Sequence, residues 1–407
     1  MDSAKRKGLS PKGNVPNLRF PEFQGEWEKK RLEECVEFLD GLRKPIKSED
    51  RKSEQGLYPY YGASGIIDYI DGYIFDGEYI LLSEDGANII DRNYRVAFIA
   101  KGKIWVNNHA HVLQPYDGFD INFLSEALER LNYAVYNTGT TMPKLNQEVC
   151  RNINLKFPTT KEQNKIGNLL SLLNERISTQ NKIIEDLKKL KSAIIEKMFC
   201  SPNREQPMCR IKGFKQPLTT YKLGSFCSRI VTKNKDAKCS LVLTIAAQYG
   251  LVNQESFFNK SVASENLTGY YLLQKGEFAY NRSYSTGYDW GAVKRLDNYD
   301  KGVLSTLYIC FKINETIVDS DYLAYYFESS KWHRGLSNIA GEGARNHGLL
   351  NVSVTDYFNT LHRFPPIEEQ KTIAKMLNSI TEKESEAVKL GECYQKQKQY
   401  LLRQMFI

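Results

Sequence analysis

Apolar residues recur at alternating intervals of three and four in two stretches of the chain, residues 158–200 and 364–407. This spacing puts them on one face of an α-helix and is typical of coiled coils. The predicted core positions are Ile166, Leu170, Leu173, Ile177, Ile184, Leu187, Ile194 and Met198 in the first stretch, and Ile373, Leu377, Ile380, Tyr394, Leu401 and Met405 in the second. We therefore predict a long helix over each stretch.

The two stretches resemble each other closely. Phe157–Phe199 and Phe364–Phe406 align without a gap, and the pairs Phe-Pro, Glu-Gln and Met-Phe recur in the same register. Two unrelated helices rich in lysine and glutamate would not keep these pairs aligned, so we interpret the pattern as an internal duplication. Each copy starts with proline and glutamate and has basic residues near its end, as the helix dipole favours.

The second copy has the weaker apolar stripe, because Glu384, Gly391 and Lys398 interrupt it. A glycine inside a helix costs about 1 kcal/mol relative to alanine, so we expect the second helix to need a partner. The first helix is the obvious candidate. A duplicated chain folds naturally about a pseudo two-fold axis, which would set the two helices antiparallel.

Each predicted helix follows a segment with globular character. The predicted division is a disordered basic tail at 1–14, a first globule at 15–157, a linker at 201–209 and a second globule at 210–363. Strand-like runs in the first globule cover Tyr79–Leu82, Arg95–Ala100, Lys103–Val106 and His111–Leu113, and a helix is expected near 121–131. Short motifs such as Leu145-Asn146 and Leu350-Asn351 echo between the globules, so the whole unit is duplicated, with more divergence in the globules than in the helices.

Composition describes a chain able to build large cores, with 41% hydrophobic and 12% aromatic residues. The eight cysteines form no C-x-x-C pair, which favours free thiols over a disulfide or zinc framework. Met1 is followed by a basic, polar stretch, and no apolar run approaches a membrane span, so we expect a cytoplasmic protein. The net charge of +8 is compatible with nucleic acid without requiring it.

Catalytic signatures are missing from the sequence. It has no phosphate-binding loop, no G-x-G-x-x-G, no H-E-x-x-H, no G-x-S-x-G and no Asn/Asp-Pro-Pro-aromatic tetrapeptide of the kind used by amino-methyltransferases. We therefore expect no catalytic site and no cofactor in this chain, and an autonomous methyltransferase or nuclease is disfavoured.

Polar loops in both globules suit contact with DNA. Glycine-rich, hydroxyl-rich and aromatic loops permit close approach to a backbone, arginine and asparagine read base edges, and lysines neutralise phosphates. The candidate DNA-binding residues are Arg43, Lys44, Tyr61, Ser64, Asn107, Asn108, His109, Lys144, Arg229, Lys233, Arg282, Tyr284, Ser285, Tyr288, Arg345, Asn346 and His347. The alternative for most of them is an ordinary solvated surface.

The pair His109-x-His111 leaves three interpretations open. Two imidazoles on one strand face could bind a metal, but no cysteine, aspartate or glutamate with clear ligand spacing accompanies them. Packing and DNA contact are the other two, and they are favoured over a metal.

Taken together, these motifs resemble one family, the DNA specificity (S) subunits of type I restriction-modification systems. The resemblance covers nearly the entire chain. It rests on Phe157-Pro158 followed by Glu162-Gln163, Phe364-Pro365 followed by Glu369-Gln370, the long helix behind each, Leu18–Phe23, Tyr61–Gly65, and Thr138–Thr140 leading to Pro143–Asn146.

The resemblance implies an α/β (α+β) protein in which two target recognition domains are separated by two long helices that form an antiparallel coiled coil. Each domain would read half of a bipartite, asymmetric DNA target, and the helices would set the spacer. Two modification subunits would bring S-adenosylmethionine, and two restriction subunits would use ATP and Mg²⁺. The competing class is a non-catalytic protein-interaction scaffold with incidental DNA binding, which salt-dependent binding to duplex DNA would distinguish.

Overall fold

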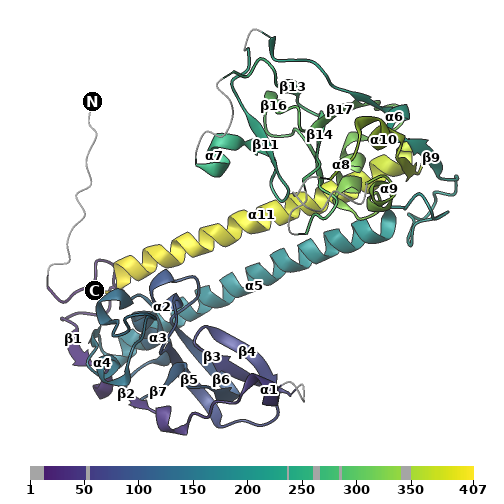
Figure 1. Ribbon diagram of the computed structural model, residues 1–407. Coiled ribbons are helices and arrows are strands. Elements are labelled where there is room, and N and C mark those ends of the chain that lie inside the picture. Colours follow the sequence, from purple (N-terminus) through teal and green to yellow (C-terminus); the bar gives the residue numbers. More distant parts are fainter. Residues whose placement is uncertain (1–12, 52–55, 236–237, 260–265, 284–286, 341–349) are drawn as a thin grey trace, which may run out of the picture. The chain divides into compact units, whose positions relative to one another are not determined.

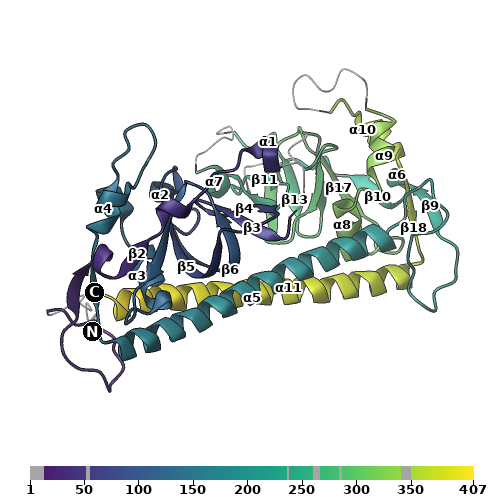
Figure 2. The ribbon, with the colours of Figure 1, turned by 90° about the horizontal axis from the view of Figure 1, so that it is seen from below.

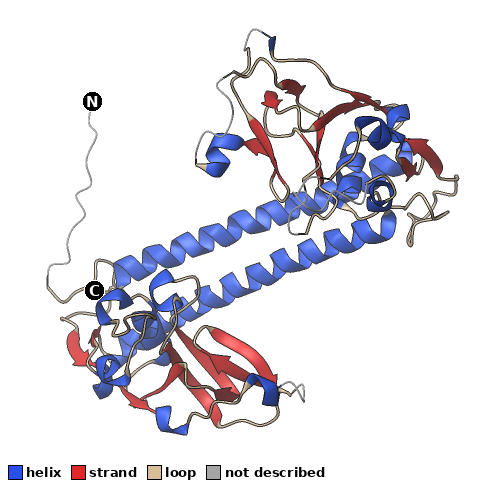
Figure 3. Cartoon of the chain, in the orientation of Figure 1, coloured by secondary structure: helices blue, strands red, loops and turns tan. Residues whose placement is uncertain are grey.

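The computed structural model describes residues 13–51, 56–235, 238–259, 266–283, 287–340 and 350–407 (Figure 1). It divides into two units. Unit 1 comprises residues 1–182 with 388–407, and unit 2 comprises residues 183–387. Each unit therefore contains one globule and part of each long helix, whereas the sequence suggested globules and helices as separate segments. Strands and helices are mixed in both units (Figure 3).

A six-stranded sheet is the centre of unit 1, with the strand order β2-β7-β5-β6-β3-β4. All neighbouring strands are antiparallel except β3 and β6. The strands are β2 (Val36–Phe38), β3 (Tyr58–Gly62), β4 (Gly65–Ile70), β5 (Phe75–Ser83), β6 (Ala97–Val106) and β7 (Ala110–Pro115).

Strand β6 joins two runs that the sequence predicted as separate strands. The predicted break between Ala100 and Lys103 is wrong, because Gly102 stays in the ladder opposite Gly77 of β5. Both glycines have positive φ, 79° and 154°. Glycine adopts such angles without the steric penalty that a side chain would bring.

Short helices and a small ribbon complete the first globule. Helix α3 (Ile121–Glu129) lies against the sheet of unit 1 (Figure 2) and contacts β6. It buries Phe123, Leu124 and Leu128 in a core cluster. Strand β1 (Glu28–Arg31) pairs with β8 (Asn154–Phe157). The other α-helices are α1 (Ser48–Arg51), α2 (Asn88–Asp91) and α4 (Gln147–Arg151), and the 3-10 helices are η1 (Leu32–Glu34), η2 (Asp40–Leu42) and η3 (Tyr133–Tyr136).

Unit 2 is built around a four-stranded antiparallel sheet in the order β10-β17-β14-β15. Three two-stranded ribbons, β11-β12, β13-β16 and β18-β9, accompany it. Its strands are β9 (Thr219–Lys222), β10 (Cys227–Arg229), β11 (Leu243–Ala246), β12 (Gly250–Asn253), β13 (Tyr271–Gln274), β14 (Phe278–Asn281), β15 (Ala292–Arg295), β16 (Lys301–Leu304), β17 (Ile309–Ile313) and β18 (Leu361–Phe364). Its short helices are α6 (Leu223–Phe226), α7 (Gln254–Phe258), α8 (Ser320–Glu328), α9 (His333–Ser337) and α10 (Val354–Asn359).

The two long helices are α5 (Thr160–Met198) and α11 (Ile367–Met405), each 39 residues long. All fourteen positions predicted for the helix seam are buried or half-buried. Gly391, which the sequence suggested as an interruption, lies buried on the same seam, and α11 continues through it without a break.

Within unit 1 the two long helices run antiparallel. Met405 near the end of α11 shares a core cluster with Ile166 near the start of α5. Further along, Asn174 of α5 and Lys398 of α11 both bond to the buried Glu126 carboxylate, at 2.8 and 3.2 Å. Residue numbers therefore rise along one helix as they fall along the other.

Unit 2 repeats this arrangement. Phe199, just beyond the end of α5, shares a core cluster with Ile373 near the start of α11. Lys191 of α5 lies 5.3 Å from the ring centre of Tyr325, whose hydroxyl bonds to Thr381 of α11. Lys191 and Lys398 occupy equivalent seam positions in the two copies. Each interrupts the apolar stripe but contacts a side chain of the adjacent globule, Tyr325 and Glu126 respectively.

The recurring Glu-Gln pair joins each globule to the long helix of the same copy, the first globule to α5 and the second to α11. In unit 1, Arg19 makes two 2.7 Å hydrogen bonds to the buried Glu162 carboxylate. The neighbouring Gln163 donates to Pro158 O and accepts from Asp120 N, the cap residue of α3. The matching residues of unit 2 are Arg210, Glu369, Gln370, Pro365 and Asp319, joined by the same bonds. Buried, bidentate pairs of this kind fix orientation as well as contact.

The recurring Met-Phe pair has a different role, because each phenylalanine enters the globule of the other copy. Phe406, which follows α11, stacks on Phe123 in the first globule, with ring centres 4.9 Å apart. Phe199, which follows α5, packs 4.8 Å from Tyr322 in the second globule. Each core is thus completed by the far end of the other copy's helix.

All eight cysteines lie in the described residues and all are free thiols. Among the described helices, none is both long and apolar enough to cross a membrane.

Candidate nucleic-acid interface

Three segments meet at one end of the unit 1 sheet. The end of β5 continues into residues 84–86, the β6–β7 turn contains residues 107–109, and residues 143–147 lead into α4. Backbone hydrogen bonds tie them together, from Leu145 N to Glu84 O at 2.7 Å, from Gly86 N to Pro143 O at 3.0 Å and from Glu84 N to His109 O at 2.9 Å.

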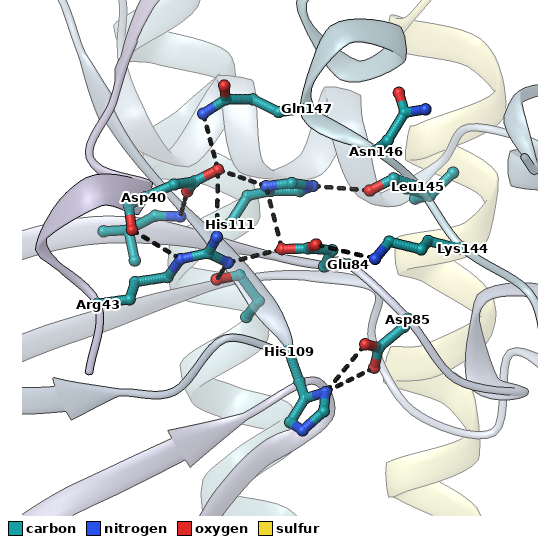
Figure 4. A network of polar contacts seen from close by, with 12 residues as sticks. Asp40, Arg43, Glu84, Asp85, His109, His111, Lys144, Leu145, Asn146 and Gln147 are labelled. Carbon is teal, nitrogen blue, oxygen red and sulfur yellow. Dashed lines mark hydrogen bonds and ion pairs between the residues drawn. The ribbon is translucent and has the colours of Figure 1, made fainter. Parts of the chain in front are cut away.

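A charged network lies beneath these segments (Figure 4). His111 is buried on β7, and its Nδ1 lies 2.7 Å from an Asp40 carboxylate oxygen. Arg43 donates to Glu84 Oε2 at 2.7 Å and to Ala110 O at 2.8 Å. Buried charges are tolerated only when paired, and this network pairs them across segments that are distant in the sequence.

His111 carries a proton on both ring nitrogens. Nδ1 faces the Asp40 carboxylate, while Nε2 lies 2.8 Å from Leu145 O. Both of these partners can only accept, so both nitrogens must donate. Burial alone would lower the pKa of His111, but its interactions with Asp40 and with the neighbouring Cys150 outweigh burial and raise the pKa to about 10. Burial likewise opposes ionisation of Asp40, yet His111 holds the pKa of Asp40 below its usual value.

The network accounts for two candidates of the sequence analysis. Arg43 is largely enclosed and uses its guanidinium internally, in support of the loops. Lys144 remains half-exposed, with its Nζ 3.5 Å from Glu84 Oε1. Gln147, which the sequence analysis did not select, donates to Asp40 from the start of α4.

The side chains presented to solvent at this end come from the turns. Ser64, Asn108 and His109 are exposed, as is Lys44. Asn107 is buried, and its side-chain oxygen accepts from His109 N at 2.8 Å, so it shapes the turn.

Tyr61 is half-buried on β3 and packs near Phe98, with ring centres 6.1 Å apart. Burial raises the pKa of its hydroxyl. Tyr61 and Asn107 therefore support the surface rather than project from it.

Unit 2 has a matching position with the opposite charge. Leu350 N donates to Arg282 O at 2.9 Å, just as Leu145 N donates to Glu84 O in unit 1. The echo of Leu145-Asn146 in Leu350-Asn351 marks this equivalence. Arg282 spans two backbone carbonyls, Val352 O and Leu307 O, each at 3.1 Å. Unit 2 thus has the cationic Arg282, bonded to carbonyls, at the position where unit 1 has the carboxylate of Glu84, bonded to Arg43 and Lys144.

Of the other candidates in unit 2, the structure describes Arg229, Lys233 and Tyr288. Arg229 is exposed and donates to Tyr271 Oη at 3.3 Å, while Lys233 lies 4.0 Å from the centre of the Tyr271 ring. Tyr288 is half-buried beside a core cluster. Tyr284, Ser285, Arg345, Asn346 and His347 lie outside the described residues.

Both histidines of His109-x-His111 have carboxylate partners. Nδ1 of His109 lies 2.9 Å from each oxygen of Asp85, and His111 pairs with Asp40. In the part of the chain that the structure describes, no group of three or more His, Cys, Asp or Glu residues could hold a metal ion.

The sequence analysis did not predict the acidic residues of the network. Asp40, Glu84 and Asp85 look like ordinary surface acids in the sequence, although Glu84 and Asp85 come shortly after the strand-like run Tyr79–Leu82. Acids at the end of a buried strand, in a globule with two histidines close in sequence, are the one signal that could have identified them.

Comparisons with known proteins agree with this architecture. Residues 24–189 match the family model described as the type I restriction modification DNA specificity domain. A protein of Haemophilus influenzae that bears the name of a type I restriction enzyme specificity subunit is 26% identical over 366 residues, or 88% of this chain and 89% of that protein. The type I restriction enzyme MjaVIII specificity subunit of Methanocaldococcus jannaschii is 25% identical over 406 residues, or 89% and 87% of the two chains.

A solved structure shares the fold. The crystal structure of the S subunit of a type I restriction-modification system from M. genitalium superposes with a TM-score of 0.63 at 16% identity, and the match covers 97% of this chain and 99% of that one. Over most of its length the chain is therefore similar to proteins named as type I restriction enzyme specificity subunits. In this chain the globule and the long helix occur twice.

Proposed function

We propose that this chain is the non-catalytic DNA specificity subunit of a type I restriction-modification complex. The observation that carries the proposal is the duplication of a whole unit, globule and long helix, in a chain that matches this family model. Each unit has its own sheet and core. A duplicated reader suits a DNA target that is read in two parts.

The two globules recognise different half-sites, and the target is asymmetric. Supporting this, the sheet end of unit 1 is organised by Asp40, Glu84 and His111, whereas the matching position of unit 2 holds Arg282. Surfaces supported by opposite charges present different hydrogen-bonding groups, and base identity is read through such groups.

The long helices set the unread spacer between the half-sites. Each helix has 39 residues, which corresponds to roughly 60 Å at 1.5 Å per residue. The buried Arg19–Glu162 and Arg210–Glu369 pairs fix each globule to its helix. A reader fixed to a stiff helix would hold its half-site at one place along the DNA.

The helices also dock the modification subunits. Ile183 of α5 and Leu390 of α11 occupy equivalent positions in the two copies and are 43% and 44% exposed. Leu190 and Tyr400, on the same respective helices, are 48% and 59% exposed. Exposed apolar residues on a helix mark a surface for a partner. Two equivalent surfaces would bind two copies of one partner, one on each unit.

Partner subunits supply the chemistry. S-adenosylmethionine is expected with the modification subunits, and ATP and Mg²⁺ with two restriction subunits. This chain contributes the choice of sequence.

A binding experiment tests the proposal. The chain assembled with its modification subunits should bind duplex DNA with an affinity that falls steeply as salt rises, because phosphate contacts release counterions. The assembled complex should methylate adenines in one bipartite sequence, and the chain alone should methylate nothing. Turnover by the pure chain, or binding that ignores both sequence and salt, would contradict the proposal.

A further inference from the structure

The exposed residue His109 is held more firmly than its position requires. Its backbone N–H donates to the side-chain oxygen of Asn107 at 2.8 Å, and its carbonyl accepts from Glu84 N at 2.9 Å. Its ring is fixed through Nδ1, which lies 2.9 Å from both carboxylate oxygens of Asp85. The His109 side chain is nevertheless 50% exposed.

Such restraint has no evident benefit for stability. Ordering an exposed side chain costs conformational entropy, and a polar contact between exposed side chains contributes little in return. Preorganisation does benefit recognition, because the entropy is lost during folding and not during binding. A rigid, exposed side chain at the end of a sheet therefore suits the reading of a ligand.

The support beneath His109 is rigid as well. Glu84, which fixes its carbonyl, is paired with Arg43 and bonded through its own carbonyl to Leu145 N. Asp85 forms a backbone bridge with Lys144. The buried network described above thus anchors the two residues that hold His109, and Figure 4 shows the Asp85 carboxylate facing the His109 ring.

The Asp85 contact determines what the ring can read. A carboxylate only accepts, so Nδ1 must carry the hydrogen. In the neutral ring the remaining nitrogen, Nε2, is then an acceptor, and it has no hydrogen-bond partner among the residues that the structure describes. In the major groove the groups that donate are the exocyclic amino groups of adenine and cytosine, while guanine and thymine present acceptors at the equivalent edge.

We propose that His109 is a specificity-determining residue whose Nε2 accepts a hydrogen bond from the exocyclic amino group of an adenine or a cytosine in the half-site read by unit 1. Asp85 is its positioning residue, since it fixes the tautomer and the ring orientation. This inference rests on the proposed function and goes beyond it, because it names the residue and the chemical group that it reads.

The test maps methylated sequences in DNA modified by the complete complex, formed with the wild-type chain or with a variant. His109→Phe keeps the ring shape but removes the acceptor. It should make one base position of one half-site degenerate, with roughly a 10- to 100-fold loss of discrimination there, while all other positions stay unchanged. Whether the wild-type position holds adenine or cytosine identifies which amino group is read.

Variants at Asp85 separate positioning from simple loss of a contact. Asp85→Ala should relax the same position, whereas Asp85→Asn should retain most of the discrimination, because its amide oxygen still accepts from Nδ1–H. Asp117→Ala is the matched control, an exposed aspartate just beyond the other end of β7. It should change nothing.

Three results would overturn the inference. The first is a His109→Phe complex with the wild-type target, the second is equal relaxation of both half-sites, and the third is a wild-type requirement for guanine or thymine at the affected position. Failure of the proposed function is distinguishable, because in that case the wild-type complex itself would show no bipartite target.

Discussion

Replacing Phe406 with alanine should weaken the first globule, although Phe406 is almost at the end of the chain. The ring is 5% exposed. It stacks on Phe123 at 4.9 Å, meets Trp27 edge-on at 6.2 Å and lies 5.4 Å below the Arg130 guanidinium. Removing a buried phenylalanine side chain costs about 3–5 kcal/mol, and we take the lower end as the expected loss.

A loss of about 3 kcal/mol raises the population of locally opened states by roughly 100-fold. Hydrogen exchange of α3 peptides, followed by mass spectrometry on the full chain, measures this population directly. We expect α3 to exchange about 100-fold faster in Phe406→Ala, while α8 of unit 2 keeps its wild-type rate. In the assembled complex, reading of the first half-site should weaken more than reading of the second.

Two matched variants complete the design. Phe199→Ala should produce the opposite pattern, because Phe199 packs at 4.8 Å from Tyr322 of α8 and 5.9 Å from Tyr326. Gln399→Ala, an exposed position on α11, should leave both units unchanged. Two results would contradict this reasoning: α3 stays protected in Phe406→Ala, or both units become less protected to the same extent. In either case the phenylalanine from the other copy would not be what completes each core.

Glu162→Ala should destabilise unit 1 by about 3 kcal/mol, because it leaves Arg19 without its buried partner, and Glu369→Ala should do the same to unit 2, which exchange rates in the two units would check. The two units should also respond to pH in opposite directions. The raised pKa of His111 gives unit 1 stability that is complete below about pH 6.5 and is lost, at about 1.4 kcal/mol per pH unit, as pH rises toward about 10. Burial lowers the pKa of His362 to about 3, so unit 2 loses stability as pH falls below about 6.5; exchange from pH 4 to 9 would show this contrast, and His111→Gln should flatten the alkaline response of unit 1. Ile183→Asp together with Leu390→Asp should abolish binding of modification subunits, whereas either change alone should leave one bound copy by light scattering. Adding about one helical turn to both long helices should lengthen the spacer without changing either half-site, as the methylated sequences would reveal.

The long helices were predictable because their information is local. Alternation of three and four identifies Ile166, Leu170 and Ile373 as seam residues without knowledge of any partner. Gly391 and Lys398 were misread because their environment is not local. Lys398 is stabilised by Glu126, which is distant in the sequence, and Gly391 lies on the buried face of α11.

The strand prediction failed at Gly102 for a similar reason. A glycine followed by lysine is typical of a turn, but here a second glycine, Gly77, opposes it in the ladder and the strand continues. Only the register of β5 against β6 makes that visible.

The candidate interface was partly predictable. The turn that carries Asn108 and His109 was identified from its polar composition, and both residues are exposed. The roles of Arg43 and Asn107 could not be derived, since their partners come from other segments. The sequence alone does not distinguish a basic residue that binds a phosphate from one that pairs with a buried carboxylate, as Arg43 does with Glu84.

The measurement that most directly tests the central claim is a map of methylated adenines in a genome where this chain is the sole specificity determinant. Two dissimilar readers in one duplicated chain predict a single asymmetric target, with two defined half-sites separated by an unread spacer of constant length. A continuous target, a symmetric one, or a spacer that varies from site to site would contradict the claim.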